Sequence, residues 1–279
     1  MKKPTDKAAP TAEYVLGHSD RELERLSTQA RLIEPITREF FIEAGIAPGM
    51  RILDVGSGAG DVAFLAADLA GDKGSVVSVD RVPEAIVTAR RRAEARSLKN
   101  VSFRGGDPAE MTFEQPFDAV VGRYVLLFQA DAAHMLRRLA RCLQPGGLVV
   151  FHEPDWNAVR SVPRAPSYDR CCRWIVEAGI SAGSDWRMAD KLHAAFLHAG
   201  LPAPTMRMKT FVGGGVETAK WLLAVGEIAA TLLPAMEKFG VATAAEVDLA
   251  TLVERMTQEV AQTNSMLFGR SEVGAWSRV

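Results

Sequence analysis

Cysteine is scarce in this sequence, and no apolar run approaches the length of a membrane span. The three cysteines are Cys142 and the adjacent pair Cys171 and Cys172, which excludes a disulfide framework and favours a reducing, cytoplasmic setting. A membrane-spanning helix needs about 20 apolar residues, so no membrane association is expected. Residues 1–14 are charged and lack the apolar core of a secretory signal.

An excess of either charge is also absent. Lysine and arginine number 33, aspartate and glutamate 34, and the formal net charge is −1. Nucleic-acid binding requires the neutralisation of many phosphates, so no nucleic-acid partner is expected. The arginines of segment 89–96 alternate with alanine and glutamate, which is typical of a solvated helix face. The 279 residues, 48% of them hydrophobic, suffice for a large core without covalent cross-links.

The central half of the chain alternates short apolar runs with amphipathic segments. The runs are nearly continuous, as expected of strands buried on both faces, and strand–helix alternation is typical of a doubly wound α/β sheet. The predicted strands are 51–55, 75–80, 101–103, 118–121 and 148–152, and the predicted helices between them are 61–70, 84–97 and 131–143.

The flanking segments suggest additions to this core. Helices are expected before residue 45, near 167–180 and 188–199, and in two or more pieces within 216–264. An extended segment spans 205–212, and a closing strand 273–279. We therefore expect a helical cap (1–45), a cofactor-binding core (46–212), a helical insertion (213–264) and a closing segment (265–279). The insertion is predicted to be a lid over an acceptor pocket, with a homodimer surface or plain core as alternatives.

A glycine-rich turn provides the sharpest signal. The segment RILDVGSGAG (51–60) places Gly56, Gly58 and Gly60 between a buried strand and a helix, where glycine allows a tight turn and close approach to a ligand. A dinucleotide fingerprint is G-x-G-x-x-G, but the sixth position here is Asp61, whose charge is unfavourable beside a pyrophosphate. This disfavours a nicotinamide cofactor and an NAD-dependent oxidoreductase.

S-adenosylmethionine fits the acidic residues around this turn better, because it has no phosphate and carries a sulfonium and an amino group. Asp80, at the end of the second strand, is placed to accept hydrogen bonds from the ribose hydroxyls. Asp107, after the third strand, is a candidate partner of the adenine amino group. The ordered set formed with Asp54 and the three glycines is more specific than any one member.

The sequence resembles the class I S-adenosylmethionine-dependent methyltransferases, especially the group related to ubiquinone/menaquinone-biosynthesis and natural-product enzymes. The matching segments are LDVGSGAG (53–60), VVSVD (76–80), GGDP (105–108), FDAVVGRYVL (117–126) and LQPGGLVVFHEPD (143–155). The resemblance covers residues 14–155 and implies a Rossmann-like, seven-stranded sheet with an antiparallel last strand. It implies these cofactor-binding residues: Tyr14, Asp54, Gly56, Ser57, Gly58, Gly60, Asp80, Arg81, Gly106, Asp107, Pro108 and Arg123.

Candidate acceptor-site residues follow the fifth predicted strand or line the second half of the chain. His152 is a candidate general base, because it ends that strand and imidazole titrates near neutral pH. Hydrogen bonding to a neighbouring loop is the alternative role of His152. No metal site is expected. The substrate-binding candidates are His18, Glu153, Asp155, Trp156, Trp174 and Trp221.

These observations predict methyl transfer to a small molecule, to oxygen more often than to nitrogen, carbon or sulfur. The Asn/Asp-Pro-Pro-Tyr/Phe motif that grips planar amino groups is absent at Gly122–Tyr124, which disfavours adenine and glutamine acceptors. A protein that binds S-adenosylmethionine without methylating is the main alternative.

Overall fold

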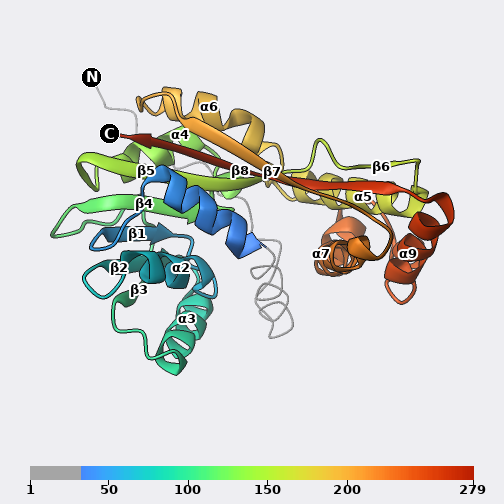
Figure 1. Ribbon diagram of the computed structural model, residues 1–279, viewed down its shortest axis with the longest axis horizontal. Helices are drawn as coiled ribbons and strands as arrows, with labels where there is room; N and C mark the ends of the chain where they lie inside the picture. Colours follow the sequence, from blue (N-terminus) through green and yellow to red (C-terminus); the bar gives the residue numbers. More distant parts are fainter. Residues whose placement is uncertain (1–32) are drawn as a thin grey trace, which may run out of the picture.

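The computed structural model describes residues 33–279 and contains, within that range, an eight-stranded sheet between helical layers (Figure 1). The sheet order is β3-β2-β1-β4-β5-β8-β6, with β7 also paired to β8. The order reverses between β1 and β4, which is where such sheets bind ligands. The strands are β1 (Arg51–Val55), β2 (Ser75–Asp80), β3 (Val101–Gly105), β4 (Phe117–Arg123), β5 (Leu143–Asp155), β6 (Arg160–Val162), β7 (Thr205–Gly214) and β8 (Met266–Arg278).

The first five strands run parallel to one another, and β8 is antiparallel to β5. The predicted fold class, including the antiparallel last strand, is confirmed. The number of strands differs from the seven expected, because the three-residue strand β6 pairs with Met266–Phe268 at the start of β8. That pairing lies beyond the part of β8 that closes the sheet against β5.

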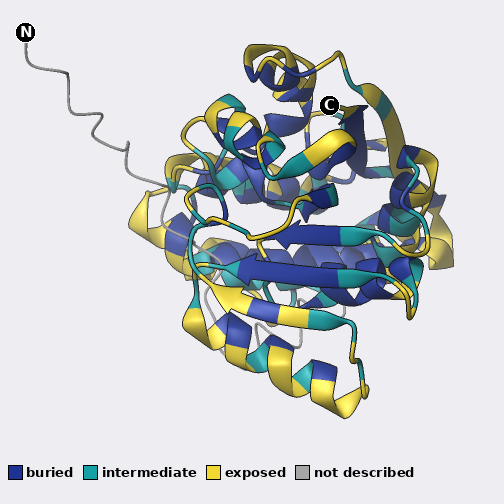
Figure 2. Cartoon of the chain, turned by 90° about the vertical axis from the view of Figure 1, so that its left-hand side faces the viewer, coloured by how far each residue is buried: buried dark blue, intermediate teal, exposed yellow. Residues whose placement is uncertain are grey.

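Helices cover both faces of the sheet. On one face, residues 33–44 and helices α2 (Asp61–Ala70) and α3 (Pro83–Ala95) bury Phe40, Ile52 and Ile86. On the other, α4 (Ala132–Ala140) and α6 (Met188–His198) pack near β5, in the cluster that holds Leu53 and Leu136. Figure 2 shows the central strands buried over most of their length, whereas edge strand β3 and helix α3 carry many exposed residues.

A second group of helices lies at the far end of β8 and is called the helical extension here (Figure 1). It consists of α5 (Pro166–Ser181), α7 (Ala219–Lys238), α8 (Ala244–Val247) and α9 (Leu252–Thr263). Helices α5, α7 and α9 contact one another pairwise. The segment Gly215–Lys238 is long and apolar enough to cross a membrane by length and composition alone, but much of α7 is buried inside the protein.

The long strands extend beyond their predicted limits. Strand β5 begins at Leu143 and ends at Asp155, and β8 begins at Met266 rather than Val273. The interior of β8 contains Arg270 and Glu272, and their charges interrupt the apolar pattern that predicts a buried strand, although both residues are only 5% exposed. These long strands connect the parallel sheet to the helical extension.

Candidate active site

The glycine turn that follows β1 has left-handed backbone at three positions. Gly56, Gly58 and Gly60 have φ values of 74°, 49° and 91°. An added Cβ would lie 2.7 Å from Val125 at Gly56 and 2.7 Å from Phe64 at Gly60, whereas at Gly58 it would meet nothing within 4 Å. Gly56 and Gly60 are therefore required by packing within the protein, and Gly58 faces space that a ligand can occupy.

Arg92 of α3 contacts the glycine turn and the start of α2. Its guanidinium donates to the Ala59 carbonyl and, at 2.7 Å, to Asp61 Oδ1. It also lies 5.3 Å from the centre of the Phe64 ring. Asp61, the residue that breaks the dinucleotide fingerprint, is thus the partner of a half-buried arginine.

The ends of β2 and β3 bring the other predicted cofactor residues together. The Asp80 carboxylate accepts hydrogen bonds from the Gly58 N–H at 2.8 Å and the Val82 N–H at 2.9 Å. Each oxygen has a second lone pair that can accept a hydrogen bond from a hydroxyl group. Arg81 forms an ion pair with Asp107, and the Gly106 N–H donates to the Asp80 carbonyl at 2.9 Å. Pro108, next in the chain, is buried.

Asp54 and Ser57 carry buried oxygen atoms that have no hydrogen-bond partner, namely Asp54 Oδ1 and Ser57 Oγ. The other Asp54 oxygen accepts a 2.6 Å hydrogen bond from Ser78. Burial raises the pKa of Asp54 to about 7. An unsatisfied buried polar group costs about 1–3 kcal/mol, so a ligand with an ammonium and hydroxyl groups would relieve this cost. The residues therefore fit S-adenosylmethionine.

A buried polar network lies next to this cradle. His152 is fully buried, with its Nε2 2.9 Å from Glu272 and its Nδ1 3.1 Å from the hydroxyl of Thr37. Glu272 also accepts from Arg270 Nε at 2.7 Å and from the Tyr124 hydroxyl at 2.6 Å. Because an ionised carboxylate only accepts, Nε2 of His152 is the donor to Glu272.

Burial and neighbouring charges shift the pKa values of both His152 and Glu272 in this network. Desolvation lowers the pKa of His152, so the imidazole is neutral. Desolvation opposes ionisation of Glu272, but Arg270, His152 and Tyr124 together outweigh it and lower the pKa of that carboxylate to about 2. Neither ring nitrogen of His152 faces open space. Because Nε2 already carries the proton donated to Glu272, a further proton would reach His152 only at Nδ1, through the Thr37 hydroxyl, or after one of these hydrogen bonds breaks.

Arg123 is the last residue of β4, and Tyr124 follows it directly. Arg123 donates a 3.2 Å hydrogen bond to Thr37. Tyr124 has a φ of 59°, a conformation that costs a non-glycine residue free energy and is held only by surrounding contacts. Here the hydroxyl contacts to Arg270, at 2.8 Å, and to Glu272 hold it.

Glu153 and Asp155 each accept hydrogen bonds from backbone N–H groups of a neighbouring loop. The fully buried Glu153 carboxylate accepts N–H hydrogen bonds from Val125 at 3.0 Å, Leu126 at 2.8 Å and Leu127 at 3.4 Å. Burial raises the pKa of Glu153 to about 8, while the three N–H donors act in the opposite direction. Asp155 accepts from the Asn157 N–H at 2.9 Å. Glu153 thus holds the loop whose Val125 packs on Gly56.

Comparison with known proteins identifies the family. A model described as a methyltransferase domain matches residues 46–191, more than half of the chain. The chain belongs to the class I S-adenosylmethionine-dependent methyltransferases. Family and fold imply S-adenosylmethionine as the cofactor, in agreement with the cradle described above.

Two curated methyltransferases illustrate the likeness. Aklanonic acid methyltransferase DauC of Streptomyces sp. (strain C5) is 38% identical over 111 residues, which cover 39% of this chain and 50% of DauC. The match to DauC therefore spans half the length of that protein. The 2-phytyl-1,4-naphthoquinone methyltransferase of Synechococcus elongatus is 29% identical over 180 residues, 62% of this chain and 73% of that protein.

Solved structures share the fold at low sequence identity. The YcgJ protein of Bacillus subtilis superposes with a TM-score of 0.54 at 15% identity, covering 87% of this methyltransferase and 98% of YcgJ. The [4+2]-cyclase SpnF has a TM-score of 0.50 at 19% identity, covering 88% and 80%. A cyclase of this fold shows that the scaffold alone does not determine the reaction.

Among the residues predicted to bind the methyl acceptor, the structure of this methyltransferase brings two together and leaves the others apart or outside the described range. Trp156 and Trp221 lie with ring centres 6.2 Å apart. Trp174 is half-buried on α5, where the Arg170 guanidinium lies 6.0 Å from its ring. Tyr14 and His18 lie outside the described residues. Within residues 33–279 no group of three His, Cys, Asp or Glu side chains is arranged to hold a metal ion.

Sequence reasoning missed part of the site, namely Tyr124, Arg270, Glu272 and Trp186. A signal existed for two of them. Arg270 and Glu272 alternate with small residues just before the apolar segment VGAW, and two charges on one face of a buried strand require partners. Tyr124 and Trp186 carried no comparable signal, because their positions depend on contacts with distant segments.

Proposed function

We propose that this protein transfers the methyl group of S-adenosylmethionine to an oxygen atom of a small-molecule acceptor. The observation that carries the cofactor half of the proposal is the pair of unpartnered buried oxygens on Asp54 and Ser57, beside the open space at Gly58. When bound, the cofactor supplies an electrophilic methyl group on a sulfonium.

Each element of the cradle has a role in this proposal. Asp54 and Ser57 receive the polar end of the cofactor, with the guanidinium of Arg123 toward the carboxylate. Asp80 accepts from the ribose hydroxyls, at the point where it already orders the Gly58 N–H. Arg81 fixes the side chain of Asp107 for the adenine end. Tyr14 is proposed to complete this site from the N-terminal segment.

Oxygen is proposed as the acceptor atom, and transfer to a hydroxyl requires that a proton be removed. His152 is proposed to orient Glu272 and, through it, the Tyr124 hydroxyl, because Nε2 of His152 already donates to Glu272 and cannot receive a proton from it. In this role His152 is a positioning residue that does not touch the acceptor. Its neutral imidazole fixes the Glu272 carboxylate, which in turn fixes the phenol of Tyr124.

The helical extension is proposed to cover the acceptor. Trp221 of α7 reaches Trp156 at the end of β5, which supports an acceptor site at the contact between the extension and the sheet. The predicted lid, 213–264, contains α7, α8 and α9 but omits α5, with which α7 packs. The unit proposed to cover the acceptor therefore includes α5.

Thermal unfolding with ligands tests the cofactor. At about 100 times its dissociation constant, a ligand raises the free energy of unfolding by about 2.7 kcal/mol. We expect S-adenosylmethionine and S-adenosylhomocysteine to raise the melting temperature and NAD to leave it unchanged. Formation of S-adenosylhomocysteine with phenols, carboxylates, amines and thiols then tests the acceptor atom. Cofactor binding with no product from any acceptor would instead favour a non-methylating activity.

A further inference from the structure

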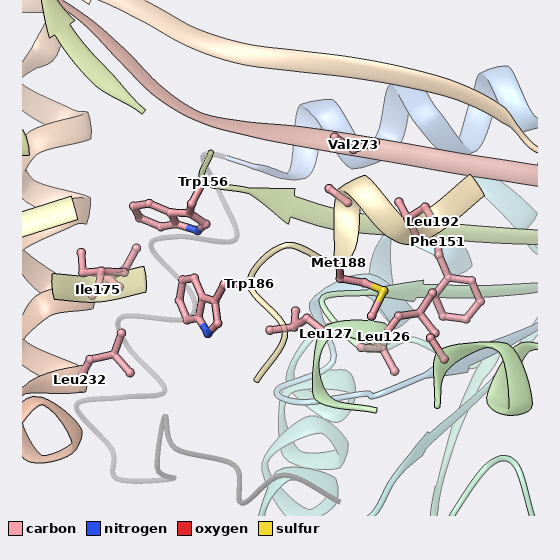
Figure 3. Close-up of a cluster of buried hydrophobic side chains, with 14 of the residues drawn as sticks. Leu126, Leu127, Phe151, Trp156, Ile175, Trp186, Met188, Leu192, Leu232 and Val273 are labelled. Atoms are coloured by element: carbon pink, nitrogen blue, oxygen red, sulfur yellow. The ribbon is translucent and has the colours of Figure 1, made fainter. Parts of the chain in front are cut away.

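Four aromatic rings from different segments gather between the sheet and the helical extension, and are called the aromatic layer here. They belong to Trp156, Trp186, Trp221 and Phe211. The Trp156 ring centre lies 5.6 Å from that of Trp186 and 6.2 Å from that of Trp221, which stacks on Phe211 at 5.7 Å. Figure 3 shows Trp156 and Trp186 between Ile175 and Leu232 on one side and Leu126 and Leu127 on the other.

The indole N–H groups of this layer are not all satisfied. Trp221 donates to the Tyr168 hydroxyl at 2.9 Å. Trp156 is 4% exposed, and its Nε1 has no hydrogen-bond partner. Trp186 Nε1 also lacks one, but it packs so closely on Gly179 that an added Cβ there would lie 1.9 Å away. Trp156 therefore offers the unused buried donor.

A second donor lies beside the first. The Arg270 guanidinium carbon is 5.7 Å from the centre of the Trp156 ring. Arg270 donates through Nε to Glu272 and through Nη2 to the Tyr124 hydroxyl, and within residues 33–279 its Nη1 makes no hydrogen bond. The buried Trp156 N–H requires an acceptor atom, and Arg270 Nη1 is a further donor available to it.

Resting on the proposed function, we propose that the methyl acceptor is an aromatic compound whose phenolate oxygen binds between Trp156 Nε1 and Arg270 Nη1. The ring of the acceptor lies against the aromatic layer, because offset and edge-on aromatic contacts are favourable. An aliphatic alcohol would not use the layer, and an aromatic hydrocarbon would leave both donors unpaired.

The chemistry balances without a further reactant. The two donors stabilise the anionic oxygen, so the phenol loses its proton to solvent on binding. The phenolate oxygen then forms a bond to the methyl carbon as the carbon–sulfur bond breaks, and the electron pair of that bond returns to sulfur. The products are a neutral aryl methyl ether and neutral S-adenosylhomocysteine.

Calorimetric titration of the S-adenosylhomocysteine complex with 2-naphthol, naphthalene and cyclohexanol tests the proposal without turnover. We expect 2-naphthol to bind about tenfold more tightly than naphthalene, equivalent to about 1.4 kcal/mol, and cyclohexanol more weakly still. In Trp156→Phe, which keeps a ring but lacks the N–H, that ratio falls toward one. The matched control is Trp276→Phe, because Trp276 is buried against Phe40 on the opposite face of the sheet.

A second measurement needs no variant. The absorbance of bound 2-naphthol is compared with that of free 2-naphthol over a pH series, and a shift of the bound form toward the naphtholate at lower pH supports the proposal. Equal affinities for 2-naphthol and naphthalene, or an unshifted spectrum, would overturn it. S-adenosylhomocysteine formed only with amines or aliphatic acceptors would also overturn it and leave methyl transfer intact. Failure of the cofactor itself to bind would contradict the proposed function instead.

Discussion

The Tyr124 hydroxyl donates a 2.6 Å hydrogen bond to Glu272 Oε2 across 148 residues of sequence. This contact joins the loop after β4, which packs on the glycine turn, to the middle of β8, which leads to the helical extension. Arg270 contacts both residues and is fully charged, since its pKa is raised by Glu272. The cofactor cradle and the proposed acceptor site therefore share one buried network, and its members are the first residues to test.

Removal of the Glu272 charge is expected to destabilise the protein strongly. Glu272→Gln leaves the buried Arg270 without its counter-charge, and loss of one partner of a buried pair costs about 3–5 kcal/mol. Chemical denaturation measures the change in the free energy of unfolding. Glu94→Gln, on the exposed face of α3, is the control. Equal stabilities of the two variants would contradict the proposed importance of the pair.

The same pair predicts a pH dependence at the acid end. The native pKa of Glu272 is about 2, below its ordinary value of 4.5. The unfolded chain therefore binds the proton first, so the contribution of Glu272 to stability is present above about pH 4.5 and is lost as the pH falls toward 2. The difference in unfolding free energy between wild type and Glu272→Gln should shrink over that range. A difference that stays constant would contradict the depressed pKa.

The raised pKa of Asp54 predicts the opposite pH dependence of stability, and it predicts that a proton is released when the cofactor binds. Its native pKa is about 7 against an ordinary 3.8, so the native state holds the proton where the unfolded chain does not. Its contribution to stability therefore falls as the pH rises from about 4 to 7. A cationic cofactor favours the ionised carboxylate, so S-adenosylmethionine should bind up to about tenfold more weakly per pH unit below 7.

Calorimetry at pH 6 in two buffers of different ionisation enthalpy measures that proton. The apparent binding enthalpy of wild type should differ between the buffers, and that of Asp54→Asn should not. Asp72→Asn, in an exposed turn, provides the control and should behave as wild type. Identical buffer dependence in wild type and Asp54→Asn would place the released proton elsewhere.

The predictions from sequence succeeded where the signal was local. Strands β1 and β2 and helix α2 have the expected limits, because continuous apolar runs and the glycine turn lie within a few residues of one another. Strand β8 begins seven residues earlier than predicted. Its polar residues are buried only because partners from distant segments satisfy them, and no sequence window contains both members of such a pair.

His152 illustrates the same limit at the site. Its place at the carboxyl end of the sheet was predictable from the apolar run that precedes it. Its environment was not, since Thr37 and Glu272 lie 115 and 120 residues away. Whether this histidine takes part in proton removal stays a prediction, and its fully buried position argues for action through Glu272.

Arg92 is expected to support cofactor binding without touching the cofactor. Arg92→Ala removes the contacts to the Ala59 carbonyl and Asp61, and charge-assisted hydrogen bonds of this kind contribute about 1.5–3 kcal/mol. The dissociation constant of S-adenosylmethionine should rise several-fold, as measured by calorimetry. Arg91→Ala is the matched control, because Arg91 is exposed on the same helix. Similar affinities in both variants would show that the turn keeps its shape unaided.

Two glycine variants separate a structural role of the turn from a binding role. At Gly60 a methyl group would collide with Phe64 and Ala89, so Gly60→Ala should destabilise the free protein by about 1–3 kcal/mol.

At Gly58 the same methyl group meets no protein atom, and only the left-handed backbone opposes the substitution, at a cost of about 1–2 kcal/mol. Gly58→Ala should therefore fold and yet bind S-adenosylmethionine at least tenfold more weakly, because the methyl group occupies the space assigned to the cofactor. Denaturation and calorimetry on the same samples measure both effects. If Gly58→Ala binds the cofactor as tightly as wild type, the cofactor does not approach this turn, and the cradle assigned to it is wrong.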